Sequence, residues 1–215
     1  MKEEEKSKFK DLTVADFLQS IASSEPTPGG GSVSALCGAL SASLGQMVTQ
    51  LTIGKTKYAE VEDPMKESSK ILTSFFEMFV EDIDLDAEAF ESVILSFQLP
   101  KNTDYEKAER DRLIQESFKI AVRTPMQIAQ KAHKIMDIIS LVAKHGNQSA
   151  VTDACVAMLC ARTAVLGAIL NVRINLSSIK DKEFVEKYKS ETDKLEKEAI
   201  EKETQLLEWV NSKIQ

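Results

Sequence analysis

Hydrophobic residues recur at helical spacing along almost the whole chain, and no stretch of any length alternates apolar and polar residues as a strand does. Proline, glycine and capping residues separate these periodic stretches. The predicted helices are a short one that begins at Thr13 and longer ones over about 32–53, 64–97, 105–144, 149–179 and 181–213. The pattern predicts one all-α domain over residues 1–215, a bundle of about six mostly long helices.

Two of the predicted helices lack the polar face that a surface helix needs. Residues 26–54 contain no charged side chain, and small residues recur every four positions at Gly31, Ala35 and Ala39. Small side chains let helices approach closely, so this helix is expected at the centre of the bundle. The helix over 149–179 is apolar and rich in small residues too. Few other helices remain to bury both on all sides, which predicts a homodimer whose second chain completes the core.

The composition limits which binding partners and which cellular compartment are expected for this protein. The uncharged stretch is long enough to cross a bilayer, but its serine, threonine and glutamine side chains suit a helix buried in protein, so no membrane span is expected. A net charge of −7 argues against nucleic acid as a partner. Residues 1–10 begin acidic and are expected to be a frayed end, not a secretory signal. Three cysteines without zinc spacing predict reduced thiols and a cytoplasmic protein.

An acidic stretch over residues 81–91 holds the side chains best suited to acid–base chemistry. Apolar residues at helical spacing run through the same helix, so at least one of these acids is expected to face inward. A buried carboxyl has a raised pKa and can exchange protons near neutral pH. Neither His133 nor His145 has a second His or Cys at helical spacing, so no metal site is predicted.

Several short motifs, taken in order, resemble a known family. They are residues 26–32 (PTPGGGS), 47–58 (MVTQLTIGKTKY), 84–90 (DLDAEAF), 99–101 (LPK), 146–154 (GNQSAVTDA) and 171–176 (NVRINL). Over about residues 11–180 this order resembles the cyclodeaminase/cyclohydrolase family of folate enzymes, which includes formiminotetrahydrofolate cyclodeaminase and a methenyltetrahydrofolate cyclohydrolase. Two positions depart from the family pattern: Thr56 interrupts the expected Gly-Lys-Lys-Tyr, and Thr152 stands where serine is expected.

The resemblance assigns roles to the candidate residues. Asp86, and after it Asp84, is implied as the carboxyl group that moves a proton. The implied substrate-binding residues are Gly29, Gly30, Gly31, Ser32, Lys55, Lys57, Tyr58, Lys101, Asn147, Asp153, Asn171 and Asn175. No cofactor beyond the tetrahydrofolate substrate is implied, and the assembly implied is a dimer.

Elementary chemistry is compatible with these roles. Backbone amides at the glycine-rich helix start can bind a carboxylate or a pterin carbonyl. Lysines can pair with the glutamate carboxylates of folate, and a tyrosine ring can stack on the pterin. Asn171 and Asn175, four residues apart, share a helix face and match a pterin's donor–acceptor edge. Structural roles are the alternatives: a cap for Ser32 or Asn147, and a favourable helix-dipole position for Asp153.

Three functional hypotheses follow. The first is a formiminotetrahydrofolate cyclodeaminase, in which N10 attacks the formimino carbon and ammonia leaves to give 5,10-methenyltetrahydrofolate. The second is a methenyltetrahydrofolate cyclohydrolase, in which water attacks the same carbon. The third is a non-catalytic helical folate-binding or interaction module. The expected partner is a tetrahydrofolate derivative, which can carry a polyglutamate tail.

Overall fold

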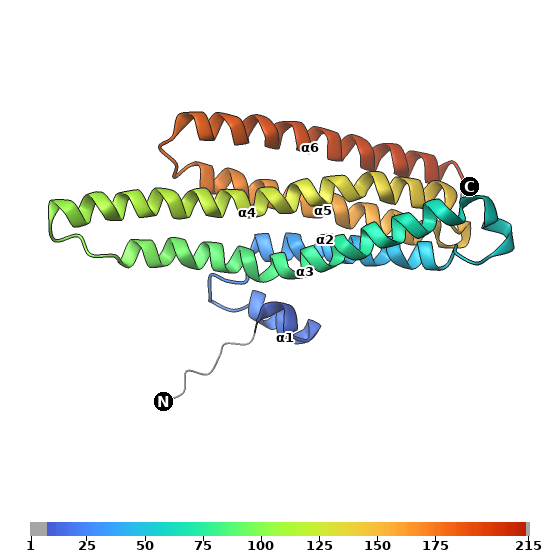
Figure 1. Ribbon diagram of the computed structural model, residues 1–215, viewed down its shortest axis with the longest axis horizontal. Coiled ribbons are helices and arrows are strands. Elements are labelled where there is room, and N and C mark those ends of the chain that lie inside the picture. The colour runs from blue at the N-terminus through green and yellow to red at the C-terminus, as the bar shows by residue number, and fades with distance from the viewer. Residues whose placement is uncertain (1–7, 214–215) are drawn as a thin grey trace.

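The computed structural model describes residues 8–213, and these form helices and turns without a strand (Figure 1). The helices are α1 (Val14–Ile21), α2 (Gly30–Gln50), α3 (Glu62–Gln98), α4 (Asp104–His145), α5 (Val151–Leu176) and α6 (Lys182–Asn211). Three short 3-10 helices join them, namely η1 (Phe9–Asp11), η2 (Thr56–Val61) and η3 (Gln148–Ala150). The predicted all-α fold with six helices is confirmed.

Local sequence explains most helix boundaries. The Thr13 side chain accepts a hydrogen bond from the backbone N–H of Asp16 and begins α1, as its pattern predicts. Asp181 caps α6 in the same way. Some boundaries differ from prediction by two or three residues: α2 spans Gly30–Gln50 instead of 32–53, and the α-helical part of α5 spans Val151–Leu176, after η3, instead of 149–179.

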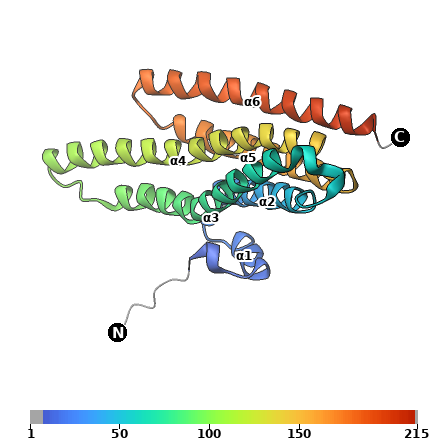
Figure 2. The same cartoon turned by 45° about the vertical axis from the view of Figure 1, so that its right-hand side comes forward.

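Helix α2 lies at the centre because its glycines admit neighbouring side chains. A Cβ at Gly38 would lie 2.6 Å from the ring of Phe79 in α3, and a Cβ at Gly167 of α5 would lie 2.5 Å from Ser34 Oγ. Helices α2 and α5 therefore pack closely against each other as an antiparallel pair. Helix α6 covers α4 and α5 from outside, while α3 and α4 form the near side in Figures 1 and 2.

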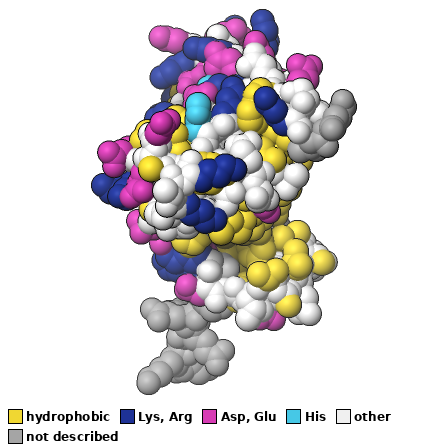
Figure 3. All heavy atoms as spheres, turned by 90° about the vertical axis from the view of Figure 1, so that its right-hand side faces the viewer, with side chains coloured by type: hydrophobic (Ala, Val, Ile, Leu, Met, Phe, Trp, Pro, Cys, Tyr) yellow, Lys and Arg dark blue, Asp and Glu magenta, His cyan; other side chains and the backbone are white. Residues whose placement is uncertain are grey.

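The two apolar helices are not buried on all sides in one protomer, which agrees with the expectation that one chain has too few helices to cover both; the homodimer itself stays a prediction. Helices α2 and α5 each keep an exposed apolar stripe, because no other helix in residues 8–213 covers it. Its large exposed members are Leu40, Met47 and Leu51 on α2, and Val156, Leu159, Leu170 and Ile174 on α5. Hydrophobic side chains also gather at the lower right of the face drawn in Figure 3.

Helix α2 and the segment Gln148–Leu176 are both long and apolar enough to cross a membrane by length and composition alone. In their most apolar windows 56% and 50% of the residues are buried inside the bundle, as in the core helices of many proteins that never enter a membrane. Their length and hydropathy are therefore weak evidence for a membrane span.

The N-terminal segment is more firmly held than predicted. Residues 1–7 of the expected frayed end lie outside the described part of the chain. Phe9 and Lys10, however, are anchored: the backbone N–H of Phe9 donates to Asp84 Oδ1 over 2.7 Å, and the Lys10 ammonium pairs with Glu81 over 2.5 Å. Residues 8–10 are therefore tied to the middle of α3.

Candidate active site

A pocket of about 130 Å³ lies where the start of α2 meets α3, α4 and α5. Three of the predicted site residues that line it, Asp86, Asn171 and Asn175, come from helices far apart in the sequence. Gly29 and Gly30 form its rim at the N-terminus of α2. The structure thus brings together five of the residues that the motifs singled out.

Asp86 lies against the first turn of α2 because Gly31 has no side chain. A Cβ at Gly31 would overlap the Asp86 carboxylate. The close approach lets the backbone N–H of Ser32 donate to that carboxylate, at the end of the helix where the dipole favours negative charge. The glycine therefore serves mainly to admit the carboxyl group.

The pKa of Asp86 is raised to about 6: burial is the largest cause, the Ser32 N–H opposes it, and the nearby Asp82 carboxylate adds a smaller rise. At pH 7 the group is mostly ionised, and its protonated form is still accessible. This is the charge behaviour that a general base at neutral pH requires.

The two asparagines hold their amide oxygens as acceptors beside this carboxyl. Asn171 Nδ2 donates to Gly167 O, and Asn175 Nδ2 donates to Ala121 O, each over 2.9 Å. Among the described residues, no donor reaches either amide oxygen. The pocket thus presents acceptors that can receive N–H groups of a ligand.

Asp84 is not in this pocket. Residues 84 and 86 are two positions apart, so they leave an α-helix about 200° apart. The carboxylate of Asp84 faces the N-terminal segment and accepts from the backbone N–H of Phe9. Its structural role is to hold η1 on α3, and the structure gives it no contact with the pocket.

Ser32 is fully buried, and its hydroxyl donates to the backbone oxygen of Ile83 over 2.8 Å. It is not the cap of α2, because Gly29 occupies that position. Its hydroxyl therefore joins α2 to α3, and its backbone N–H holds Asp86. Neither group is left to bind a ligand directly.

The remaining lysine, tyrosine and N-terminal α5 candidates lie at the other end of the bundle. Helix α2 separates the two ends by about 30 Å, at 1.5 Å per residue over its 21 residues. Lys55 and Lys57 are exposed there, and Lys57 Nζ lies 5.3 Å from the centre of the Tyr58 ring. Asp153 lies in the first turn of α5 at the same end. We call these four residues the distal cluster.

Asn147 belongs to the same end but is occupied by structural hydrogen bonds. Its backbone N–H donates to Thr52 Oγ1 over 2.8 Å, and its side chain donates to Leu51 O and caps η3. The backbone N–H of Gln148 donates to the Tyr58 hydroxyl, and this bond is the main reason that the pKa of Tyr58 is lowered. Asn147 therefore holds the C-terminal end of α2 in place. This is a structural role, the alternative to ligand binding given for Asn147 above.

Lys101 lies in the exposed loop between α3 and α4 and does not line the pocket. Conversely, the structure adds pocket residues that sequence reasoning missed. Phe90 lies in the DLDAEAF motif four residues after Asp86, and this spacing could have identified it. Ala121 carried no such signal, because only the packing of α4 against α5 brings it to the pocket.

No group of three or more His, Cys, Asp or Glu side chains that could hold a metal ion occurs within residues 8–213. The chemistry available in the pocket is proton transfer by one carboxyl group and hydrogen bonding by amides. Fold and pocket together define a helical protein with an acid–base site at Asp86.

Comparison with known proteins identifies this class more closely. A family model described as formiminotransferase-cyclodeaminase matches residues 13–194. A methenyltetrahydrofolate cyclohydrolase from Methylorubrum extorquens is 40% identical, over 94% of this chain and 97% of that protein. The chain therefore belongs to the formiminotransferase-cyclodeaminase family, and it is an enzyme of the cyclodeaminase/cyclohydrolase type.

Two other proteins are similar to this chain, one in sequence and one in structure. The formimidoyltransferase-cyclodeaminase of Gallus gallus is 32% identical over 88% of this chain, which spans only 34% of that longer protein. The crystal structure of a formiminotetrahydrofolate cyclodeaminase from Thermotoga maritima matches with a TM-score of 0.85 and 24% identity, covering 96% of this chain and 99% of that one. The latter match shows that the fold is shared.

Proposed function

We propose that this protein is a methenyltetrahydrofolate cyclohydrolase. The observation that carries the proposal is the Asp86 carboxyl, with a pKa of about 6, in a pocket with two amide acceptors. The 40% identity to the Methylorubrum extorquens cyclohydrolase, over nearly the full length of both chains, supports this activity more than the cyclodeaminase that the sequence alone favoured.

In the proposed reaction water attacks the methenyl carbon between N5 and N10. Asp86 accepts one proton from that water as the C–O bond forms, giving a tetrahedral centre. The C–N5 bond then breaks, Asp86 returns the proton to N5, and the second water proton is released as the formyl C=O forms. The product is 10-formyltetrahydrofolate. The methenyl carbon is already a cationic electrophile, so we propose that no cofactor beyond the folate is needed.

Asn171 and Asn175 are proposed to orient the pterin, because their amide oxygens can accept its N–H groups. The backbone N–H groups at Gly30 and Gly31 can bind the pterin carbonyl at the positive end of α2. Orientation matters here since attack requires the water, the carbon and Asp86 to be aligned.

The proposal is tested by absorbance at the methenyltetrahydrofolate band. A catalysed fall with 5,10-methenyltetrahydrofolate, slowed by about a thousandfold with Asp86→Asn, is the expected result. A catalysed rise with 5-formiminotetrahydrofolate, with release of ammonia, and no fall with the first substrate would instead establish the cyclodeaminase. That second candidate keeps the support of the 32% identity to the Gallus gallus protein. No change with either folate would favour the non-catalytic module.

We further propose that the enzyme works as a homodimer joined through the exposed apolar stripe of α2 and α5. A pocket of about 130 Å³ is smaller than the roughly 300–1,000 Å³ of ordinary ligand sites, so one protomer does not enclose a folate. Antiparallel pairing of two stripes would place the distal cluster of one chain beside the Asp86 pocket of the other. Lys55 and Lys57 would then meet the glutamate tail.

Mixing two inactive variants tests the shared site. Asp86→Asn in one chain and Lys57→Glu in the other leave one intact site in each mixed dimer, so co-refolded equal amounts should recover about a quarter of wild-type activity. Recovery would be absent if each chain carried a complete site, provided that Lys57→Glu alone is inactive. Ile174→Glu, which puts a charge in the stripe, should yield monomers by light scattering.

The thiols agree with a cytoplasmic location, which we also propose. Cys37, Cys155 and Cys160 are free, and burial raises the pKa of each thiol. Such thiols are poorly reactive and suit a reducing compartment.

A further inference from the structure

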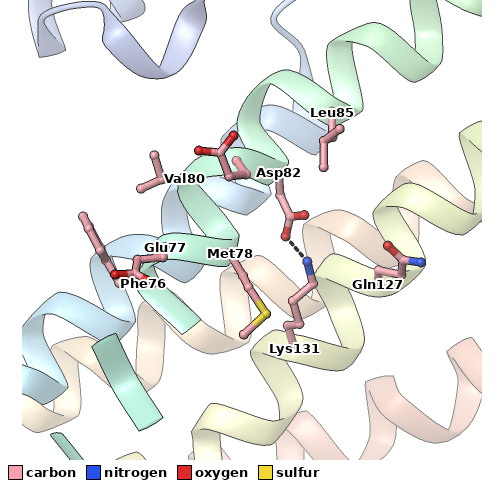
Figure 4. A pocket seen from close by; sticks show the side chains of 9 residues that line it. Phe76, Glu77, Met78, Val80, Asp82, Leu85, Gln127 and Lys131 are labelled. Carbon is pink, nitrogen blue, oxygen red and sulfur yellow. Dashed lines mark hydrogen bonds and ion pairs between the residues drawn. The ribbon is translucent and has the colours of Figure 1, made fainter. Parts of the chain in front are cut away.

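A buried ion pair lies one helical turn before Asp86. The Asp82 carboxylate is bonded to the Lys131 ammonium of α4, and Asp82 is only 4% exposed. The pair lines an open groove of about 610 Å³ between α3 and α4. Figure 4 shows the two side chains pointing toward each other from these two helices. The folate reaction described above does not use either residue.

Asp82 and Asp86 lie on the same side of α3. Residues four apart differ by only about 40° around a helix and are spatial neighbours. Two buried carboxylates at this spacing repel each other, and each resists ionisation while the other is charged. Burial raises the pKa of Asp82 also, and the Lys131 ammonium opposes this rise. The Lys131 ammonium therefore offsets the negative charge of Asp82, which would otherwise oppose the ionisation of Asp86.

The charged side chains named below, on the other elements around Asp86, contact groups other than Asp86. Helix α2 carries no charged residue. On α5, Arg173 pairs with Asp193 and Glu196 of α6. On α4, Arg123 lies over the Phe184 ring. The groups tied to the N-terminal segment are Asp84, which binds Phe9, and Glu81, which binds Lys10. Asp82, one turn before Asp86 on α3, is the charged group that acts on the Asp86 carboxyl, and Lys131 is the partner of Asp82.

We propose that Asp82 and Lys131 are positioning residues that act through Asp86, by fixing the net charge beside its carboxyl group. The pair holds that charge near zero, so Asp86 stays mostly ionised at neutral pH yet close enough to titration to return its proton. The catalytic consequence rests on the proposed function, whereas the electrostatic coupling itself does not.

Three variants distinguish the effect of the Asp82 charge on Asp86 from the effect of the Lys131 charge. Lys131→Met leaves Asp82 uncompensated, so the Asp82–Asp86 pair should take up a proton at a pH higher by about one unit. Asp82→Asn leaves the ammonium beside Asp86, so Asp86 should titrate below its wild-type pH. The double variant, Asp82→Asn with Lys131→Met, removes both charges and should titrate between the two single variants. It also avoids a buried unpaired charge, so it keeps the test valid if either single variant fails to fold.

The experiment is carbon-13 NMR of the full chain labelled at the aspartate carboxyl carbons, with Asp86 assigned from the resonance lost in Asp86→Asn. The matched control is Lys134→Met, which removes an exposed lysine of the same helix. The proposal requires the titration order Lys131→Met, then double variant, then Asp82→Asn, from highest to lowest pH, with the control unchanged. Equal titration of Asp86 in all folded variants would overturn it.

A second readout links the pair to catalysis. The lower pH limb of kcat/KM should move with the NMR titration, in the same direction for each variant. A loss of activity with an unmoved limb would mean that the pair is only structural, which contradicts the proposal. If the NMR order holds but neither folate is turned over, the coupling stands and the proposed function fails.

Discussion

Replacing Asp86 by asparagine is expected to lower kcat by about a thousandfold while the protein still folds. A positioned general base contributes roughly 10²- to 10⁴-fold to rate, and Asp86 is the one carboxyl that lines the pocket. Asparagine keeps the shape of the side chain and can still accept from the Ser32 N–H. The measurement is stopped-flow hydrolysis of 5,10-methenyltetrahydrofolate, with the exposed Glu91→Gln on the same helix as the control.

The pH dependence of kcat/KM tests whether Asp86 is the catalytic base. In the wild type kcat/KM should fall as the pH is lowered through about 6, the pKa of Asp86, and the residual activity of Asp86→Asn should lack this limb. Retention of the limb in Asp86→Asn would assign the base to another residue.

The stability of the protein should depend on pH through the same carboxyl group. The folded pKa of Asp86 lies above the value of about 3.9 for an unfolded chain, so the folded state binds the proton more tightly. Wild-type stability should therefore fall as the pH rises from about 4 to 6, by up to roughly 3 kcal/mol for a two-unit shift. Asp86→Asn should lack this fall. Denaturant unfolding at pH 4 and at pH 7.5 measures the difference.

The second large effect is expected for Gly31→Ala. Alanine is favoured over glycine inside a helix by about 1 kcal/mol, so helix propensity alone predicts a gain in stability. The added Cβ would, however, overlap the Asp86 carboxylate. The carboxyl must move away from the Ser32 N–H, and kcat should fall by about a hundredfold, since misplacement of about 1 Å costs that much in an aligned site.

Gly45→Ala is the matched comparison in the same helix. There the added Cβ would overlap Ile139 of α4 and lie 3.0 Å from Leu72 of α3, both in the core. Overpacking of this kind costs about 1–3 kcal/mol of stability. At a temperature where both variants are folded, Gly45→Ala should keep kcat and lose thermal stability, whereas Gly31→Ala should lose kcat. Equal loss of kcat in both would show a general effect of packing.

The helices were predictable because their signals are local. Thr13 caps α1, and the uncharged, small-residue stretch correctly predicts the central position of α2. The Asp86 pocket was partly predictable for a similar reason: Asp86, Asn171 and Asn175 lie in motifs, and the two asparagines share a helix face by spacing alone.

What sequence reasoning missed depends on contacts between distant segments. Asp84 and Asp86 look equivalent along the chain, and only the packing of the N-terminal segment assigns Asp84 to Phe9, 75 positions away. The Asp82–Lys131 pair spans 49 positions and left no local pattern. Likewise, Asn147 fits a capping role as well as a ligand role until Thr52 and Leu51 are seen to occupy it.

Three carboxylates on α3, at alternate positions, serve three different neighbours. Asp82 binds Lys131 of α4, Asp84 binds the backbone at Phe9, and Asp86 binds the start of α2. Inserting or deleting one residue upstream in α3 would turn all of them by about 100° and break the three contacts together. Relatives of this protein should accordingly vary in length within the connecting loops at 51–61, 99–103 and 177–181, and keep α3 free of insertions and deletions even where its sequence drifts.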